Sequence, residues 1–532
     1  MHGGDIYRNS AELDFSVNIS PLGVPRRVAE ALRNSLLYVE RYPDLRCEKL
    51  VKLLSEKHRV DEDKIICGNG ASELIMAISH AAMPEKAVLT APGFSGYEHA
   101  LKAVGAEIVY YYLKEETGFG IGEDMFSLLE EKRPSVIFFA NPNNPSGKAV
   151  SAAWMEKLAK LCARTGTLLV IDECFSEMVS GNMEVSFEKR VSAYPNVIIL
   201  KAFTKSFSIP GIRLGYCLCS ETGLAGRIRA QLPEWNVSVP AQMAGAAALE
   251  KEESLADMRK VVERERKYLT KELSGIVKKV FSSDANYLLF YDGRDWYGSL
   301  LREKILIRDC SDYEGLGKGY YRIAVRRHRD NKMLVSKMKE IIGQELKERG
   351  IRLNPAEESV TKRVIHTSAD FEYADTLCYS ENAVEIAKKL IRDGADIVTD
   401  TNMARAGINK KILGTFGGTV RCFMAEEDVA AKARERGLTR AAVSMERAAG
   451  LLKPSVFAVG NAPTALIALY EMMKKGMFKP AFIIGVPVGF VNVEAAKELF
   501  LYSDVPYIIN RGRKGGSNVA AAICNAILYS MV

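Results

Sequence analysis

Apolar residues from about position 60 onward occur in short continuous runs, each followed by a turn and then by an amphipathic stretch. Continuous apolar runs are typical of strands buried on both faces, and their alternation with helical patterns is typical of a largely parallel sheet with crossover helices. The pattern predicts strands at 64–67, 87–90, 135–140, 167–171 and 197–200.

The pattern changes after residue 231, where long charged helices replace the alternation. Residues 258–273 form the clearest helix, and short strands are expected at 287–291, 305–308 and 321–325. This region predicts a smaller α+β domain packed on the first sheet.

A polar segment divides the chain near residue 350. A helix expected over 333–349 runs into Gly-Ile-Arg-Leu-Asn-Pro-Ala-Glu-Glu at 350–358, a helix stop followed by a proline-containing stretch. The alternation then begins again, with strands at 397–399, 419–423, 455–459, 481–486 and 506–509. We therefore expect a first unit at 1–350, a linker at 351–360 and an independent α/β unit at 361–532.

Composition narrows the range of partners and locations. The 532 residues allow roughly three folding units, and the net charge of +7 is spread without a lysine tract, which argues against nucleic acid and favours small anionic substrates. The ten cysteines show neither CxxC nor zinc spacing, so we expect no metal site and a cytoplasmic location. The N-terminus lacks a signal sequence, and no apolar run approaches the ~20 residues that span a bilayer, so we expect no membrane association.

Chemically distinctive residues follow the strands of the first half. Ligands of parallel α/β sheets bind beyond the carboxyl ends of the strands, so these residues are considered together. A glycine turn that opens a helix can bind phosphate, an aromatic ring can stack on a flat cofactor, and a carboxylate that ends an apolar strand needs a cationic or strong donor partner. The distinctive residues that follow these strands are Gly70 and Ala71, Phe94, Asn144, Asp172, Lys205 and Arg213.

In this order and at these spacings, residues 1–345 resemble the fold-type I pyridoxal-phosphate enzymes, in particular the histidinol-phosphate aminotransferase branch. The resemblance implies that Lys205 binds the cofactor aldehyde covalently and that Asp172 keeps the pyridine nitrogen protonated. It also implies that Asn144 bonds the ring oxygen, that Phe94 stacks on the ring, and that the phosphate is bound by Gly70, Ala71, Thr204 and Arg213. Tyr42, in Arg-Tyr-Pro-Asp at 41–44, would reach the cofactor phosphate of a neighbouring subunit, which implies a homodimer.

Further motifs resemble the threonine-phosphate decarboxylases of cobalamin synthesis. They are His-Gly-Gly at 2–4, the segment 14–23, Arg-Asp-Cys at 308–310 and the segment 321–326. Two arginines suit a substrate that carries both a carboxylate and a phosphate. The resemblance implies that His2, Asn18, Arg308 and Arg322 fix the substrate pose. Asp5 stands where asparagine is usual, and Phe175 replaces a frequent tyrosine, so transamination stays open as the alternative reaction.

The second half contains its own constellation, beginning with His366 after a short apolar run. A histidine titrates near neutral pH and can donate or accept a proton. Together with the motifs at 399–403, 437–440, 460–465, 485–490 and 511–517, it resembles the precorrin-8 methylmutase family over residues 360–532. The resemblance implies that His366 handles a proton during methyl migration and that substrate carboxylates meet Arg440, Asn461, Thr464 and the loop from Arg511 to Ser517.

Both resemblances imply one biosynthetic pathway, that of cobalamin. They predict a bifunctional enzyme that uses pyridoxal phosphate in its first half and no further cofactor in its second. The rival interpretation is an aminotransferase joined to a non-catalytic tetrapyrrole-binding or dimerisation module. Whether the corrinoid contains cobalt stays open.

Overall fold

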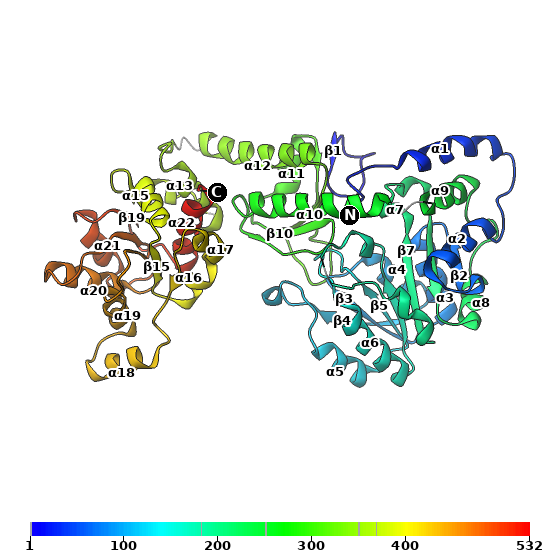
Figure 1. Ribbon diagram of the computed structural model, residues 1–532, viewed down its shortest axis with the longest axis horizontal. Helices are drawn as coiled ribbons and strands as arrows, with labels where there is room; N and C mark the ends of the chain where they lie inside the picture. Colours follow the sequence, from blue (N-terminus) through cyan, green and yellow to red (C-terminus); the bar gives the residue numbers. More distant parts are fainter. Residues whose placement is uncertain (1–2, 182, 251–252, 349–351, 369, 532) are drawn as a thin grey trace. The chain divides into compact units, whose positions relative to one another are not determined.

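The computed structural model describes residues 3–181, 183–250, 253–348, 352–368 and 370–531 (Figure 1). The chain divides into two compact units, Met1–Ser274 with Lys279–Glu340, and Gly275–Lys278 with Ile341–Val532. The division falls within helix α12 (His328–Glu348), and the segment expected as a linker at 351–360 contains the start of helix α13 (Glu358–Ser368).

The first unit is built on a seven-stranded sheet of order β2-β8-β7-β6-β5-β3-β4. Neighbours from β7 to β4 pair in parallel, whereas β8 pairs antiparallel with both β2 and β7. The sheet is thus largely parallel, as expected, with one antiparallel strand, β8, next to the edge strand β2. Its strands are β2 (Ile65–Gly68), β3 (Lys86–Ala91), β4 (Glu107–Tyr112), β5 (Val136–Ala140), β6 (Leu168–Asp172), β7 (Val197–Ala202) and β8 (Gly215–Cys219).

Helices cover both faces of this sheet (Figure 1). One face packs against α3 (Ala71–Ala82), α4 (Ser95–Ala103) and α8 (Thr222–Arg229). The other packs against α2 (Glu48–His58), α5 (Asp124–Lys132), α6 (Ala152–Thr165) and α9 (Val239–Leu249). Apolar side chains on both faces explain why the strands consist of continuous apolar runs. The short helix α7 (Phe203–Ser206) follows β7, and α1 (Arg26–Ser35) packs against α9.

A smaller α+β part completes the first unit, as the sequence predicts. Its antiparallel sheet has the order β12-β13-β10-β9, and β1 pairs in parallel with β11. The strands are β1 (Leu13–Asp14), β9 (Lys279–Val280), β10 (Tyr287–Tyr291), β11 (Ile305–Leu306), β12 (Arg308–Asp309) and β13 (Tyr320–Ala324). The accompanying helices are α10 (Glu253–Leu273), α11 (Trp296–Arg302) and α12.

The second unit has a six-stranded sheet of order β14-β19-β18-β17-β15-β16, parallel except for the pair β14 and β19. Its strands are β14 (Leu377–Tyr379), β15 (Asp396–Thr399), β16 (Val420–Arg421), β17 (Ser455–Val459), β18 (Phe482–Gly485) and β19 (Tyr507–Asn510). The carboxyl ends of β15, β17, β18 and β19 therefore lie along one edge, where ligands of such sheets bind.

Helices α18 (Glu427–Glu435), α19 (Arg440–Ala449), α20 (Pro463–Lys474) and α21 (Val493–Leu501) share one apolar cluster with this sheet. Helix α22 (Ser517–Tyr529) packs on β17 and β18, and α13, α15 (Ala383–Arg392) and α16 (Asn402–Gly407) pack around it. The remaining helices are α14 (Tyr373–Thr376) and α17 (Lys410–Thr415). Among the described residues, no helix combines the length and the apolar character needed to cross a membrane.

Candidate active sites

A cavity of about 140 Å³ lies beyond the strand ends of the first unit, and Lys205 lines it. Five other predicted residues line the same cavity, namely Asn18, Phe94, Asn144, Arg308 and Arg322. The chain's beginning contributes as well, through Gly3 and Asn18. The structure thus brings together residues that are up to about 300 positions apart in the sequence.

Lys205 is held in α7, directly after β7, where its backbone carbonyl accepts a hydrogen bond from Ser20 N at 2.9 Å. Burial lowers the pKa of its amine, and the neighbouring charges of Arg322 and Arg213 lower it further, against the opposing effect of Cys174 and Asp172. A lowered pKa enlarges the neutral fraction of the amine, which is the nucleophilic form.

Asp172 ends β6, and two donors orient its carboxylate. Tyr97 OH donates to Oδ2 at 2.6 Å, and Cys174 N donates to Oδ1 at 2.9 Å. Tyr97 is buried, stacks on Phe138 with 5.2 Å between ring centroids and meets Phe94 edge to face at 5.4 Å. Sequence reasoning passed over Tyr97, although it stands in the same Pro-Gly-Phe-Ser-Gly-Tyr motif as Phe94.

Gly70, Ala71 and Arg213 form a cradle at the N-terminus of α3. Gly70 has φ +82°, and a Cβ on it would lie 2.5 Å from Arg213 Nη2, so the guanidinium rests directly against this glycine. Ala71 is the first residue of a 12-residue helix, whose N-terminal N–H groups favour an anion. The buried Thr204 follows β7 in α7. A phosphate fits this combination of a helix N-terminus and a guanidinium.

Arg322 and Arg308 are both buried in the cavity wall. Arg322 donates through Nη1 to Asn144 Oδ1 and through Nη2 to Ser16 O at 2.8 Å. Arg308 Nη2 donates to Asp312 Oδ1 at 2.7 Å. Because Asn144 Oδ1 accepts from Arg322, the amide nitrogen of Asn144 is left to act as a donor.

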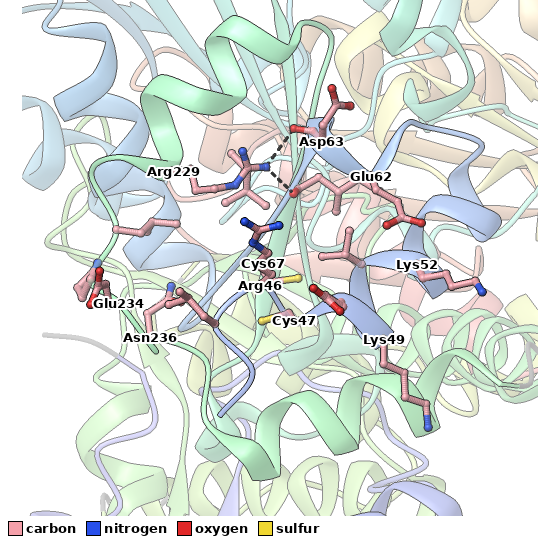
Figure 2. Close-up of a pocket in the computed structure, with 17 residues that line it drawn as sticks. Arg46, Cys47, Lys49, Lys52, Glu62, Asp63, Cys67, Arg229, Glu234 and Asn236 are labelled. Carbon is pink, nitrogen blue, oxygen red and sulfur yellow. Dashed lines mark hydrogen bonds between the residues drawn. The ribbon is translucent and has the colours of Figure 1, made fainter. Parts of the chain in front are cut away.

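The remaining predicted residues do not line this cavity: Gly70, Ala71, Asp172, Thr204 and Arg213 have the positions described above. His2 lies outside the described residues. Tyr42 is 80% exposed and does not line the cavity, and its ring instead lies 4.8 Å from that of Trp235. A separate cavity of about 780 Å³ lies just past this segment, lined by residues such as Arg46, Cys47 and Arg229 (Figure 2).

In the second unit, Asp400 organises the loop after β17. The carboxylate of Asp400 is fully buried and accepts N–H bonds from Gly460, Asn461 and Ala462 at 2.9, 2.7 and 2.7 Å. Burial raises the pKa of Asp400 despite these three bonds. The carboxylate thus fixes the loop that carries Asn461 and begins α20.

Further hydroxyl bonds join the neighbouring strand ends. Thr439 Oγ1 donates to Thr464 Oγ1 at 2.8 Å, next to Arg440 at the start of α19. Thr401 Oγ1 lies 2.8 Å from Ser517 Oγ at the start of α22. Thr464 and Ser517 therefore lie at the predicted edge, and Asn461, Arg440 and Arg511 are exposed there.

His366 lies in α13 and is 5% exposed, with Nδ1 3.1 Å from the carbonyl oxygen of Gly275 in the same unit. Lys514 of the 511–517 loop donates to Asp370, two positions after the end of α13, at 2.6 Å. Sequence reasoning overlooked Arg363, one turn before His366. Its Nε and Nη1 are buried and have no hydrogen-bond partner among the described residues, and the guanidinium lies 5.9 Å from the ring centre of Tyr529.

Comparisons with known proteins match both halves. The family of class I and II aminotransferases matches residues 11–338, and precorrin-8X methylmutase matches residues 335–530. Threonine-phosphate decarboxylase of Salmonella typhimurium is 32% identical over 64% of this chain and 96% of that protein. Cobalt-precorrin-8 methylmutase of the same organism is 44% identical over 34% of this chain and 83% of that protein.

The structure of histidinol-phosphate aminotransferase from Clostridium acetobutylicum has a TM-score of 0.58 and 31% identity, over 62% of this chain and 98% of that chain. It confirms the predicted fold-type I architecture of the first unit. The chain therefore belongs to the class I and II aminotransferase family over residues 11–338 and, over residues 335–530, to the precorrin-8X methylmutase family.

Proposed function

We propose that this chain is a bifunctional enzyme of cobalamin biosynthesis. Its first half decarboxylates L-threonine O-3-phosphate to (R)-1-aminopropan-2-yl phosphate, and its second half moves a methyl group to convert (cobalt-)precorrin-8 to the corresponding cobyrinate or hydrogenobyrinate. The observation that carries the first activity is the pair of buried arginines that shares one small cavity with Lys205. The domain boundary that we propose leaves residues 1–350 to the first activity and 361–532 to the second.

The residues of the cavity fit pyridoxal phosphate. The cradle of Gly70, Ala71 and Arg213 suits its phosphate, Asp172 suits its ring nitrogen, and Lys205 has a lowered pKa suited to attack on its aldehyde. The cofactor supplies an electron-withdrawing ring that accepts charge from the substrate carbon. Phe94 would stack on the ring, Asn144 would donate to its oxygen, and Thr204 would contribute to the phosphate site.

The two arginines decide the reaction by orienting the substrate. Decarboxylation requires the bond from Cα to the carboxylate to stand perpendicular to the cofactor ring, whereas transamination requires the Cα–H bond there. Arg308 and Arg322 bind the carboxylate and phosphate of the substrate, and His2 and Asn18 also bind the substrate. A guanidinium binds such groups through two parallel hydrogen bonds, which fixes angle as well as distance.

Two measurements test the first activity. Borohydride treatment of the cofactor-loaded chain is expected to leave reduced cofactor on the peptide that contains Lys205, and Lys205→Ala is expected to lose the visible absorbance of bound cofactor. Carbon dioxide release from threonine phosphate without any keto acid supports decarboxylation. A requirement for 2-oxoglutarate would instead establish the rival aminotransferase.

The second activity depends on His366 as the group that handles a proton at the macrocycle. Asn461, Thr464, Arg440, Arg511 and Ser517 bind the carboxylates of the substrate from the common edge of the sheet. In purified full-length protein, His366→Ala is expected to abolish conversion of the precorrin while retaining product binding. Unchanged turnover would remove His366 from the mechanism, and a wild-type chain that binds without turnover would support the rival carrier function.

We also propose that the chain works as a homodimer in the cytoplasm. The segment before α2 exposes Leu36, Leu37, Val39 and Tyr42, an apolar surface that a second copy could cover, and all ten cysteines are free. If Tyr42 completes the partner's phosphate site, mixed dimers of Lys205→Ala and Tyr42→Phe chains recover activity, because each contains one intact site. Mixtures as inactive as the separate variants would reject the shared site.

A further inference from the structure

The loop 511–514 has its backbone carbonyls turned toward donors from other segments. Lys497, which is 1% exposed on α21, donates through Nζ to Gly512 O at 2.7 Å and to Lys514 O at 2.8 Å. The buried Asn510 donates through Nδ2 to Arg511 O and Lys514 O, both at 2.9 Å. Gly489 N donates to Arg513 O at 3.2 Å. All four carbonyls from Arg511 to Lys514 therefore accept a hydrogen bond from within the protein.

This arrangement decides where the loop's N–H groups point. In a trans peptide the carbonyl and the following N–H point in opposite directions. The N–H groups of residues 512–515 are accordingly directed away from the donors that bind carbonyls 511–514. They precede α22, whose N-terminus also favours anions, so the loop presents donors to a negatively charged ligand.

Binding two carbonyls through a buried lysine costs free energy, because the amine loses hydration when it is buried. Burial lowers the pKa of Lys497 to about 8, opposed by the carboxylate of Glu494 one turn earlier. The charged side chains of the loop have partners of their own: Arg513 Nε lies 3.6 Å from Glu494 Oε1, and Lys514 Nζ donates to Asp370 and Glu372.

The elements packed against α21 place neutral groups near it. On α20, Tyr470 meets the ring of Phe500, and on β19, Tyr507 donates to the carbonyl of Leu501 at 3.2 Å. Asn510 shows that a neutral amide can hold one of the same carbonyls, that of Lys514. The amine of Lys497 differs from the amide of Asn510 by its positive charge, which it places next to the loop.

We propose that Lys497 is a positioning residue of the second site, which turns the N–H groups of residues 512–515 toward a polycarboxylate corrinoid and adds positive charge next to them. This inference rests on the proposed function of the second half. Lys497 touches the loop and acts on the ligand through it.

The test measures binding of cobyrinate to full-length protein by its visible absorbance, from pH 7 to pH 9.5. Wild-type affinity is expected to fall on the order of tenfold over this range as Lys497 loses its proton, the size of one charge-assisted bond. Lys497→Met is expected to bind weakly at every pH, without this dependence. Lys474→Met, which removes an exposed lysine from the neighbouring α20, should keep both the affinity and the profile of the wild type.

Stability moves in the opposite direction and serves as the internal check. The folded pKa of about 8 lies below the unfolded value of about 10.4, so the unfolded chain binds more protons between them and the free energy of unfolding rises with pH. Loss of the Lys497 proton therefore cannot weaken binding by destabilising the fold. Wild-type affinity for Lys497→Met, or the wild-type pH dependence surviving in it, would overturn the proposal.

Hydrogen exchange of the peptide that covers residues 511–516 gives a readout without any corrinoid. Faster exchange in Lys497→Met, and in Lys497→Gln as a second variant, is the expected result, and unchanged exchange in a folded variant rejects the positioning role. If neither variant folds, the pH dependence of wild-type affinity tests the proposal by itself. An affinity that does not change from pH 7 to pH 9.5 contradicts it. A wild-type chain that binds no cobyrinate at any pH rejects the proposed function of the second half, while the exchange result still judges Lys497.

Discussion

Glu188 belongs to a buried charge network next to the residues of the first site. Its Oε2 lies 2.8 Å from Lys201 Nζ and 3.2 Å from His58 Nδ1, and Lys201 Nζ is also 3.5 Å from Glu173, the residue after Asp172. Burial alone would raise the pKa of Glu188, but His58 and Lys201 outweigh it and hold that pKa well below its usual range. The network therefore contributes stability that depends on pH.

The sign of this dependence follows from the lowered pKa. The contribution of Glu188 is complete above its unfolded value of about 4.3 and is lost as the pH falls through the lower folded value. Glu188→Gln is expected to lower the free energy of unfolding at pH 7 by about 1–3 kcal/mol and to flatten its decline between pH 5 and pH 3. Urea unfolding measures both, with the more exposed Glu184→Gln as the control. Parallel pH curves for wild type and Glu188→Gln would contradict this account.

At the scale of elements, one carboxylate determines the conformation of a loop. Asp400 is expected to be needed for the turn between β17 and α20, since its three N–H bonds have no substitute in an amide that presents its own donors. Asp400→Asn should cost about 3 kcal/mol and speed hydrogen exchange across residues 460–465. Asp393→Asn, at an exposed position after α15, provides the matched control. Equal exchange in the two variants would show that the loop holds its shape by itself.

At the scale of elements, the sequence alone predicts some strands and helices and not others. Doubly buried strands such as β5 and β17 are predictable, because their apolar runs are continuous and bounded by turns. Strand β4 was missed, since its residues are only partly buried at the sheet's edge, and β14 is too short for a pattern. Helix α13 begins inside the expected linker because its packing partner, α22, lies about 150 residues further along the chain.

Some residues of the candidate sites are likewise predictable from the sequence, and others are not. Lys205, Asp172 and Arg213 follow strands, so their position along the chain already suggests a common edge. Tyr97 is 75 residues from Asp172, and Asp400 is 60 residues from Gly460. Their roles exist only as contacts between distant segments, and one sequence contains no signal for such a pairing.

For the whole molecule, the two compact units imply that the two activities are separable. Each unit has its own sheet and apolar cluster, and the proposed reactions share no substrate. Fusion of the halves then serves common expression or assembly, because the two steps are not consecutive and no intermediate could pass directly between them.

Reciprocal variants of the full chain test this independence. Lys205→Ala is expected to abolish carbon dioxide release and leave corrinoid conversion within about twofold of wild type, since substitutions at sites that share no partners act additively. His366→Ala should do the reverse. Each variant is the folding control for the other, because retention of the second activity shows that the chain is intact. If one variant lost both activities, one half would depend on the state of the other. The follow-up would assay each activity while the other half is saturated with its own substrate. Energetic coupling between two binding sites acts in both directions, so each substrate should then alter the activity of the other half.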